Sequence, residues 1–316
     1  MTSNSIVIDC DTGRDDALSL WLALASGMDL AAVVASYGNT TLENVSENCA
    51  RVLALAGRSD IQLWQGETFP SRAHAAVEAI LLPKQKVSGN GLCNLELPRA
   101  SRQAEVLDAS ARADRLRQIT ATKGAIDYVI LGPATNFAAT CEALGDEAGK
   151  VIASVTMMGG KMDGLWDEMP GADFNIACDP FSVQTLLEQG CDRGFPVRFV
   201  PMNVTWPIVL DMLQLESLTA SSVIGQTAKD LMIAHARHFA PEPVFRFHDP
   251  CVILALMETD TFRVRNLRVV CDEASVDFGR LVDDDTGCKV HVLEATSELR
   301  DQFLNEILTR LSISRA

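Results

Sequence analysis

The sequence alternates short apolar runs with longer segments in which apolar residues recur at helical spacing. A β-branched run at 5–8 precedes a helical pattern at 16–25, and a near-continuous apolar run at 30–36 precedes a second helical pattern at 42–56. Near-continuous apolar runs are typical of strands that are buried on both faces of a parallel sheet. The alternation therefore predicts an α/β fold with an open, mostly parallel central sheet, a Rossmann-like core, flanked by helices.

The same alternation continues to the end of the chain. We expect strands at 128–131, 151–158, 198–200, 267–270 and 290–293, and helices at 134–144, 180–189, 217–239, 249–257 and 298–311. The polar stretch 99–117 is weakly amphipathic and indicates a surface helix. No internal repeat, low-complexity segment or linker is visible, so residues 1–316 are predicted to form a single domain.

The acidic charge balance narrows the choice of partners. Lys and Arg total 27 against 42 Asp and Glu, which gives a formal net charge of −15. Such a chain repels phosphate backbones and anionic lipid, which argues against nucleic acid and membrane surfaces as partners. It suits a neutral small-molecule substrate and a divalent cation.

The cysteines and the N-terminus indicate a cytoplasmic protein. Nine cysteines are scattered along the chain with no Cys-x-x-Cys spacing, which fits a reduced compartment better than a disulfide framework. The N-terminus enters a strand pattern without a basic leader, so we expect no signal peptide. The most apolar early stretch, 18–36, is interrupted by Gly27 and Asp29, which argues against a membrane span.

Four aspartates lie within eight residues directly after the first expected strand. They are Asp9, Asp11, Asp15 and Asp16. Ligands of open parallel sheets bind beyond the carboxyl ends of the strands, where these carboxylates would converge and repel one another. Ca²⁺ or Mg²⁺, which prefer oxygen ligands, would relieve that repulsion. The simpler alternative is one aspartate that caps the following helix beside solvated neighbours.

Two enzyme classes share part of this pattern. Ile-Val-Ile-Asp-Cys-Asp-Thr matches the nucleophile loop of haloacid-dehalogenase-type phosphatases, in which the first aspartate, here Asp9, attacks phosphorus. That interpretation needs a later acidic motif, and the closest string, at 145–150, lacks its second aspartate. It also leaves Asp15 and Asp16 without a role.

The whole run resembles a different signature. Asp-Cys-Asp-Thr-Gly-Arg-Asp-Asp-Ala is similar to the DxDxGxDDA motif of the inosine–uridine-type nucleoside N-ribohydrolases. Further motifs of that family follow in order: Asn39 after the second strand, Leu-Gly-Pro-Ala-Thr-Asn at 131–136, Met-Gly-Gly at 158–160, Ala-Asp-Phe-Asn-Ile at 172–176, Asp-Pro at 179–180 and His-Asp-Pro at 248–250.

The resemblance implies a Ca²⁺ ion that binds a water and the 2′- and 3′-hydroxyls of ribose. It also implies that the protein forms a homodimer or a homotetramer. The implied Ca²⁺ ligands are Asp11, Asp16, the backbone carbonyl of Thr135, and Asp249. The implied substrate contacts are Asp15, Asn39, Asp167, Asp173, Asn175, Trp166 and His248. Of these, Trp166 would stack on the nucleobase, and His248 would contact it or protonate it as it leaves.

The implied reaction is hydrolysis of the N-glycosidic bond of a ribonucleoside to ribose and free base. Its transition state resembles an oxocarbenium ion, so the enzyme must activate water, place negative charge near the ribosyl cation and assist the departing base. Asp11 is the expected general base, because it would contact both the cation and the water. A single direct attack predicts inversion at C1′.

Four positions depart from the family pattern. Thr12 replaces a proline, Asp173 replaces the usual glutamate, Asp167 stands where the family has a Gly-Asn pair, and Ser88 replaces a histidine. These changes favour a second hypothesis, in which the metal site persists but the chain binds nucleosides without hydrolysis or takes an altered ribosyl substrate. Trp206 is expected to serve packing or a subunit contact.

Overall fold

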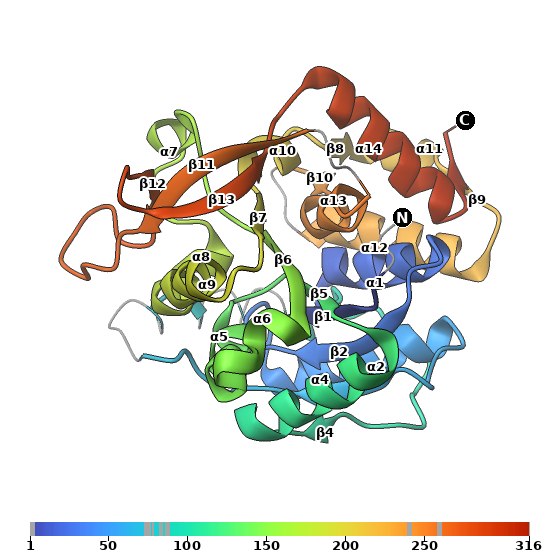
Figure 1. Cartoon of the computed structure of the whole chain (residues 1–316). Coiled ribbons are helices and arrows are strands. Elements are labelled where there is room, and N and C mark those ends of the chain that lie inside the picture. The colour runs from blue at the N-terminus through green and yellow to red at the C-terminus, as the bar shows by residue number, and fades with distance from the viewer. Residues whose placement is uncertain are drawn as a thin grey trace.

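The computed structural model describes residues 4–72, 77, 79–81, 85, 89–238, 242–257 and 261–315 (Figure 1). Within these residues, ten strands form one sheet in the order β12-β11-β13-β7-β6-β5-β1-β2-β3-β4. The strands are β1 (Ile6–Cys10), β2 (Leu30–Ala35), β3 (Gln62–Gln65), β4 (Glu105–Val106), β5 (Ile126–Ile130), β6 (Ile152–Met158), β7 (Val197–Val200), β11 (Phe262–Val269), β12 (Leu281–Asp283) and β13 (Cys288–Leu293).

The sheet is mostly parallel, as the sequence predicts. β1 lies in the middle and pairs in parallel with β2 and β5, and parallel pairing extends outward to β4 on one side and to β13 on the other. Only β11 and β12 run antiparallel to their neighbours, at one edge. The predicted α/β class is confirmed.

Helices cover both faces of the sheet (Figure 1). The helices are α1 (Arg14–Ala25), α2 (Leu42–Leu55), α4 (Ala109–Lys123), α5 (Thr135–Leu144), α6 (Ala148–Val151), α7 (Leu165–Glu168), α8 (Phe174–Cys178), α9 (Pro180–Arg193), α10 (Met202–Thr205), α11 (Met212–Ser217), α12 (Val223–His238), α13 (His248–Ala255) and α14 (Ser297–Arg310). One core cluster joins the sheet to α1, α2, α12, α13 and α14, and another joins it to α4, α5 and α9.

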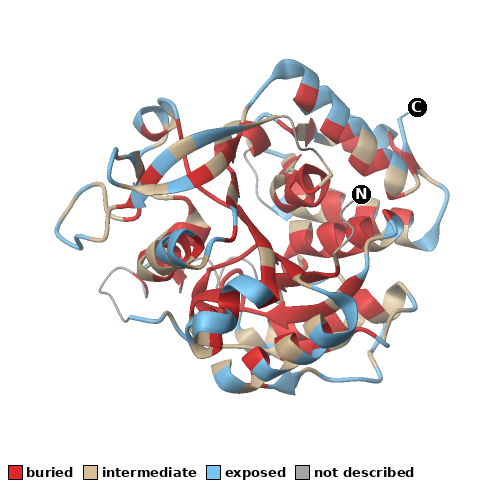
Figure 2. Ribbon diagram, in the orientation of Figure 1, coloured by how far each residue is buried: buried red, intermediate tan, exposed pale blue. Residues whose placement is uncertain are grey.

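The central strand shows why apolar runs become this sheet. All five residues of β1 are buried, and their side chains alternate between the two core clusters: Ile6 and Ile8 face one, and Val7 faces the other. Figure 2 shows the buried residues concentrated in the sheet and on the helix faces that cover it. Asp9 and Asp11 come at the carboxyl end of this strand, where the core gives way to a cavity.

Two predicted helices differ from those in the structure. The stretch 99–117 contains the two-residue strand β4 before α4 begins at Ala109, because the Asp108 side chain accepts a hydrogen bond from the Ala111 N–H and caps the helix there. The stretch 217–239 is divided among the end of α11, strand β9 (Thr219–Ala220) and α12, and residue 239 lies outside the described residues.

Two small antiparallel pairs complete the described structure. β8 (Val209–Asp211) pairs with β10 (Val244–Arg246), and β9 pairs with β14 (Ile313–Ser314). The first pair carries residues to the rim of the cavity described below. In the part of the chain that the structure describes, every helix is too short or too polar to cross a bilayer.

Candidate active site

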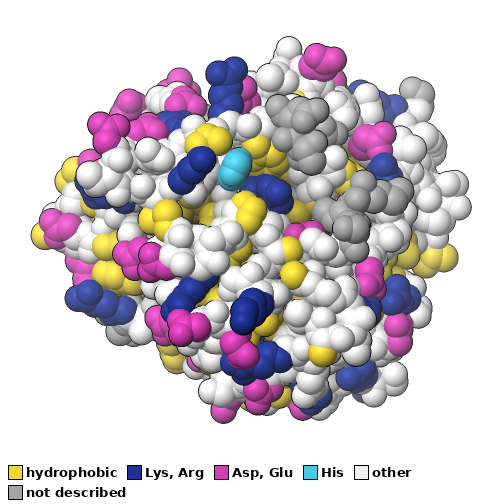
Figure 3. All heavy atoms as spheres, in the orientation of Figure 1, with side chains coloured by type: hydrophobic (Ala, Val, Ile, Leu, Met, Phe, Trp, Pro, Cys, Tyr) yellow, Lys and Arg dark blue, Asp and Glu magenta, His cyan; other side chains and the backbone are white. Residues whose placement is uncertain are grey.

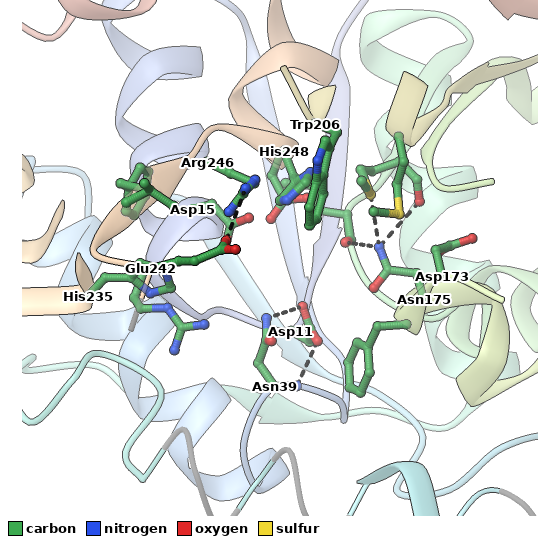
Figure 4. Close-up of a pocket in the computed structure, with 18 residues that line it drawn as sticks. Asp11, Asp15, Asn39, Asp173, Asn175, Trp206, His235, Glu242, Arg246 and His248 are labelled. Carbon is green, nitrogen blue, oxygen red and sulfur yellow. Dashed lines mark hydrogen bonds and ion pairs between the residues drawn. The ribbon is translucent and has the colours of Figure 1, made fainter. Parts of the chain in front are cut away.

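A cavity of about 490 Å³ lies beyond the carboxyl ends of the parallel strands (Figure 4). Its lining combines an acidic floor with an aromatic and basic rim. The lining residues used below are Asp11, Arg14, Asp15, Asn39, Leu131, Asp173, Asn175, Trp206, His235, Glu242, Phe245, Arg246, His248 and Asp249. Seven residues predicted from the sequence, Asp11, Asp15, Asn39, Asp173, Asn175, His248 and Asp249, are therefore brought together here.

Three carboxylates cluster at the floor, where Asp15 and Asp249 line the cavity and Asp16 is buried beside them; they come from the N-termini of two packed helices. Asp15 and Asp16 open α1, Asp249 is the second residue of α13, and one oxygen from each lies within 4.8 Å of the others. Asp16 and Asp249 are buried. Burial, together with the neighbouring carboxylates, raises the pKa of Asp16 and of Asp249 well above the ordinary value.

The hydrogen bonds of Asp16 leave one oxygen for a ligand. Its Oδ2 accepts from the Gly13 N–H at 2.9 Å and from Asn39 Nδ2 at 3.4 Å. Its Oδ1 is buried and has no hydrogen-bond partner among the described residues. A buried acceptor without a donor, facing two further carboxylates, fits a hard divalent cation with oxygen ligands.

Asp11 is fixed separately by the loop after β2. Asn39 donates to it twice, from its backbone N–H to Oδ2 at 2.7 Å and from Nδ2 to Oδ1 at 3.0 Å. Asp11 lines the cavity but is not among the three carboxylates that cluster within 4.8 Å. The observed cluster thus contains Asp15, for which the sequence predicted a substrate contact, beside the predicted ligands Asp16 and Asp249.

Asp173 and Asn175 form the opposite wall (Figure 4). Asp173 caps α8, accepting from the Ile176 N–H at 3.3 Å, and also accepts from the Gly160 N–H at 2.7 Å. Burial raises the pKa of Asp173. Asn175 Nδ2 donates to the Leu131 carbonyl at 2.7 Å. The shorter side chain of Asp173 therefore still lies on the cavity wall, held by two backbone N–H groups.

The rim is built on Trp206, which follows α10, and on the residues around β10. The guanidinium carbon of Arg246 lies 3.9 Å from the centre of a Trp206 ring, and the Trp206 and His248 rings are 6.1 Å apart. His248 Nδ1 hydrogen-bonds with Thr205 Oγ1 at 2.8 Å. His235 packs edge-on against Phe245, with ring centres 5.2 Å apart.

The sequence predicts the Thr135 carbonyl as a cation ligand, but Thr135 is not among the residues that line the cavity, so this ligand stays a prediction. Thr135 is the first residue of α5 and is buried. Its hydroxyl is buried in hydrogen bonds with Asp179 and Tyr37, and Thr135 does not line the cavity. Leu131, at the other end of the same motif, does line it.

The structure does not bring Trp166 and Asp167, the other predicted substrate contacts, to the cavity. Both lie on α7, outside the cavity, and Asp167 is exposed. The Trp166 ring packs instead beneath Arg280, whose guanidinium carbon lies 5.1 Å from the ring centre. The longer 161–172 loop folds away because Lys161 donates to the carbonyls of Met169 and Gly171, both at 2.8 Å.

The lining residues that sequence reasoning did not predict include Arg14, Trp206, Glu242 and Arg246. Arg14 lies inside the aspartate motif, so its position was a signal that could have found it. Trp206 was predicted to serve packing or a subunit contact, but it lines the cavity. The predicted departure at Ser88 lies outside the described residues.

Asp9 is buried beneath the cavity and does not line it. Its carboxylate accepts from Asn136 Nδ2 and Tyr128 Oη, both at 3.0 Å. Burial raises the pKa of Asp9 to about 7. An enclosed carboxylate of this kind has no access to a phosphate ester, so the phosphatase alternative is wrong.

Comparison with known proteins agrees with this geometry. The sequence profile of the family described as inosine-uridine preferring nucleoside hydrolase matches residues 6–304. The pyrimidine-specific ribonucleoside hydrolase RihA of Photobacterium profundum is 31% identical over 268 residues, which cover 82% of each chain. The RihA of Salmonella paratyphi A is 30% identical over 266 residues, 81% of this chain and 80% of that protein.

Solved structures share the fold over almost the whole chain. A plant nucleoside hydrolase, PpNRh1, superposes with a TM-score of 0.81 at 21% identity and covers 98% of this chain and 99% of its own. A purine-preferring ribonucleoside hydrolase from Gardnerella vaginalis gives a TM-score of 0.77 at 23% identity, with 98% of each chain covered. The chain therefore belongs to the inosine-uridine preferring nucleoside hydrolase family and is an N-ribohydrolase, an enzyme that acts on N-glycosyl bonds.

Proposed function

We propose that this cavity hydrolyses ribonucleosides to ribose and free nucleobase in a reaction that depends on Ca²⁺. The observation that carries the proposal is the cluster of Asp15, Asp16 and Asp249, whose oxygens lie within 4.8 Å of one another on the cavity floor. The unpartnered Oδ1 of Asp16 supports a cation there rather than a purely structural cluster. Bound Ca²⁺ would supply oxygen coordination for the ribose hydroxyls and would acidify water at the floor.

Asp11 is the proposed general base. Asp11 lines the cavity, and the two N–H donors of Asn39 fix the orientation of its carboxylate, a group that can accept a proton from water. A positioned general base contributes about 10²–10⁴-fold to the rate. Asp11 lines the same cavity and lies outside the cluster of Asp15, Asp16 and Asp249.

The ribose would be held between the floor and the Asp173 wall. Asp15, Asn39, Asp173 and Asn175 offer carboxylate and amide groups around the cavity, which is a suitable set for a sugar with several hydroxyls. Backbone N–H groups hold Asp173 and the Leu131 carbonyl holds Asn175, so these groups are oriented before the substrate arrives. The carboxylates of Asp15 and Asp173 would also stabilise the developing ribosyl cation.

His248 is the proposed proton donor to the leaving base. His248 lines the cavity, and the hydrogen bond between its Nδ1 and Thr205 Oγ1 fixes the orientation of the ring there. A base that receives a proton or a hydrogen bond as the N-glycosidic bond breaks is a better leaving group. The cytoplasmic location and the homodimer or homotetramer stay predictions from the sequence.

The test is ribose release from inosine, adenosine, guanosine, uridine and cytidine, with added Ca²⁺ and with chelator. We expect release that chelator abolishes, and a loss of about 10²–10⁴-fold in kcat for Asp11→Asn. Asp9→Asn is the matched control, because Asp9 is an equally buried neighbour that does not line the cavity, and it should retain more activity than Asp11→Asn. If no nucleoside releases ribose from protein that has bound Ca²⁺, the proposal fails and nucleoside binding without hydrolysis is favoured.

A further inference from the structure

The positively charged guanidinium of Arg246 lies on the rim of the cavity, and the proposed reaction gives it no role. Arg246 is the last residue of β10, and its guanidinium carbon stacks 3.9 Å from the Trp206 ring centre. Its Nη2 lies 3.6 Å from Glu242 Oε2. In Figure 4, Arg246 and Glu242 lie across the cavity from Asp173 and Asn175. A ribose on the acidic floor would therefore direct its nucleobase toward this part of the rim.

One N–H group of Arg246 lacks an acceptor. Its Nε is buried and has no hydrogen-bond partner in the parts of the chain that the structure describes. The two contacts that hold the guanidinium, an aromatic face and an ion pair to Glu242, do not engage this atom. A buried donor without an acceptor costs free energy, and a ligand that brings an acceptor to it recovers that cost. The arrangement points to a hydrogen-bond acceptor on the substrate.

We propose, building on the proposed function, that Arg246 reads the nucleobase and selects bases that present a carbonyl oxygen over bases that present an amino group at the same edge. A guanidinium carries only donors, so it pairs with the carbonyl of hypoxanthine, guanine or uracil. The amino group of adenine or cytosine is also a donor and leaves the Nε–H of Arg246 unpaired. Inosine should therefore be a better substrate than adenosine, and uridine a better substrate than cytidine.

Glu242 supports Arg246 rather than selecting amino groups itself. The Glu242 side chain is 76% exposed, whereas that of Arg246 is 22% exposed. Water therefore satisfies the lone pairs of Glu242 when no substrate is bound, and an amino group on the base gains little from it. The buried donor on Arg246 has no such alternative, so it dominates the choice of base.

The experiment compares kcat/KM for inosine with adenosine and for uridine with cytidine. Wild-type protein should prefer inosine and uridine. Arg246→Met, which keeps an apolar side chain against Trp206, should lower kcat/KM for inosine and uridine by about tenfold to a hundredfold, with adenosine and cytidine changed by about twofold or less. Glu242→Gln should keep the preference. Arg237→Met is the matched control, because Arg237 is exposed on α12 and pairs with Glu216, so its ratios should equal those of wild type.

Three results would overturn the assignment of Arg246. They are an equal loss for all four nucleosides, no loss for any of them, and a wild-type preference for adenosine and cytidine. If the wild-type protein cleaves none of the four, the proposed hydrolysis fails separately, and dissociation constants for the same pairs then test Arg246. A tighter complex with inosine and uridine that Arg246→Met loses would support it, and equal affinities would reject it.

Discussion

The position of Asp11 depends on a residue that has no side chain. Gly38 has φ of +153°, and a Cβ placed there would lie 2.1 Å from Asp11 Oδ2. This close approach lets the chain turn after β2 and present both N–H groups of Asn39 to the carboxylate. Asp11 is therefore held by backbone geometry as much as by its own hydrogen bonds.

Gly38→Ala should displace Asp11 and lower kcat by about a hundredfold, since a misplacement of about 1 Å costs a catalytic group roughly that much. Gly57→Ala is the matched control, because Gly57 also has positive φ (+68°) but nothing within 4 Å of its Cβ position. Both variants should lose about 1–2 kcal/mol of unfolding free energy. Steady-state kinetics and urea unfolding measure the two effects, and a Gly38→Ala enzyme with normal kcat would contradict the account.

The sequence located the polar residues of the site better than its rim. The acidic residues follow strands or open helices, and parallel strands bring such positions to one edge of the sheet, so Asp11, Asp15 and Asp249 were predictable. The position of the 161–172 loop was not, because the hydrogen bonds from Lys161 to the Met169 and Gly171 carbonyls leave no pattern in the sequence. The stacking of Arg246 on Trp206 joins residues forty apart and leaves no local pattern.

At the scale of elements, Asp29 links the start of β1 to the end of α4. Its carboxylate accepts from Ser5 Oγ at 2.5 Å and from Lys123 Nζ at 2.8 and 2.9 Å. The hydrogen bond from Lys123, and then that from Ser5, lowers the pKa of Asp29. A lowered carboxyl pKa means that this contribution to stability is present above the ordinary Asp pKa and is lost as pH falls through the value in the folded protein.

Asp29→Asn should therefore cost about 0.5–1 kcal/mol of unfolding free energy at pH 7, the range of exposed ion pairs, and progressively less below about pH 4. Urea unfolding from pH 7 down to pH 3 measures the difference. Lys123→Met provides a double-mutant cycle, in which the two changes together should cost less than their sum. A cost that stays constant with pH would show that the ion pair contributes nothing.

The sequence predicted a helix correctly where its apolar face and its N-cap residue indicated the same start. Asp179 and Pro180 open α9 as predicted, with Asp179 accepting from the Ser182 N–H at 3.0 Å. The surface stretch 99–117 was harder, because its helical pattern is weak and the cap at Asp108 decides where α4 begins. Strand β4 has only two exposed residues, so no apolar run could signal it.

At the scale of the whole molecule, the acidic floor joins three parts of the chain. The aspartates come from the loop after β1, from α1 and from α13, and α1 packs against α13 in one core cluster. With a net charge of −15, the folded state concentrates repulsion at this point. On the face in Figure 3, Lys and Arg side chains are interspersed with Asp and Glu rather than gathered into a basic area.

Ca²⁺ should therefore stabilise the folded protein as a whole. At a free concentration of 100 times its dissociation constant, a ligand that binds only the folded state adds about 2.7 kcal/mol. We expect the midpoint of thermal unfolding to rise with Ca²⁺ for wild-type protein and to rise less at the same Ca²⁺ concentration for Asp16→Asn, which keeps the size of the side chain but removes the carboxylate charge. A midpoint that rises equally in both would place the effect elsewhere.

The central claim is that the acidic floor makes the cavity hydrolytic by binding Ca²⁺. Its most direct test is the rate of ribose release measured across a titration of free Ca²⁺, starting from exhaustively chelated protein. The account predicts no turnover in chelated protein, saturable recovery with Ca²⁺, and a shift of the curve to higher Ca²⁺ for Asp16→Asn. Full turnover by protein that contains no bound metal would contradict it.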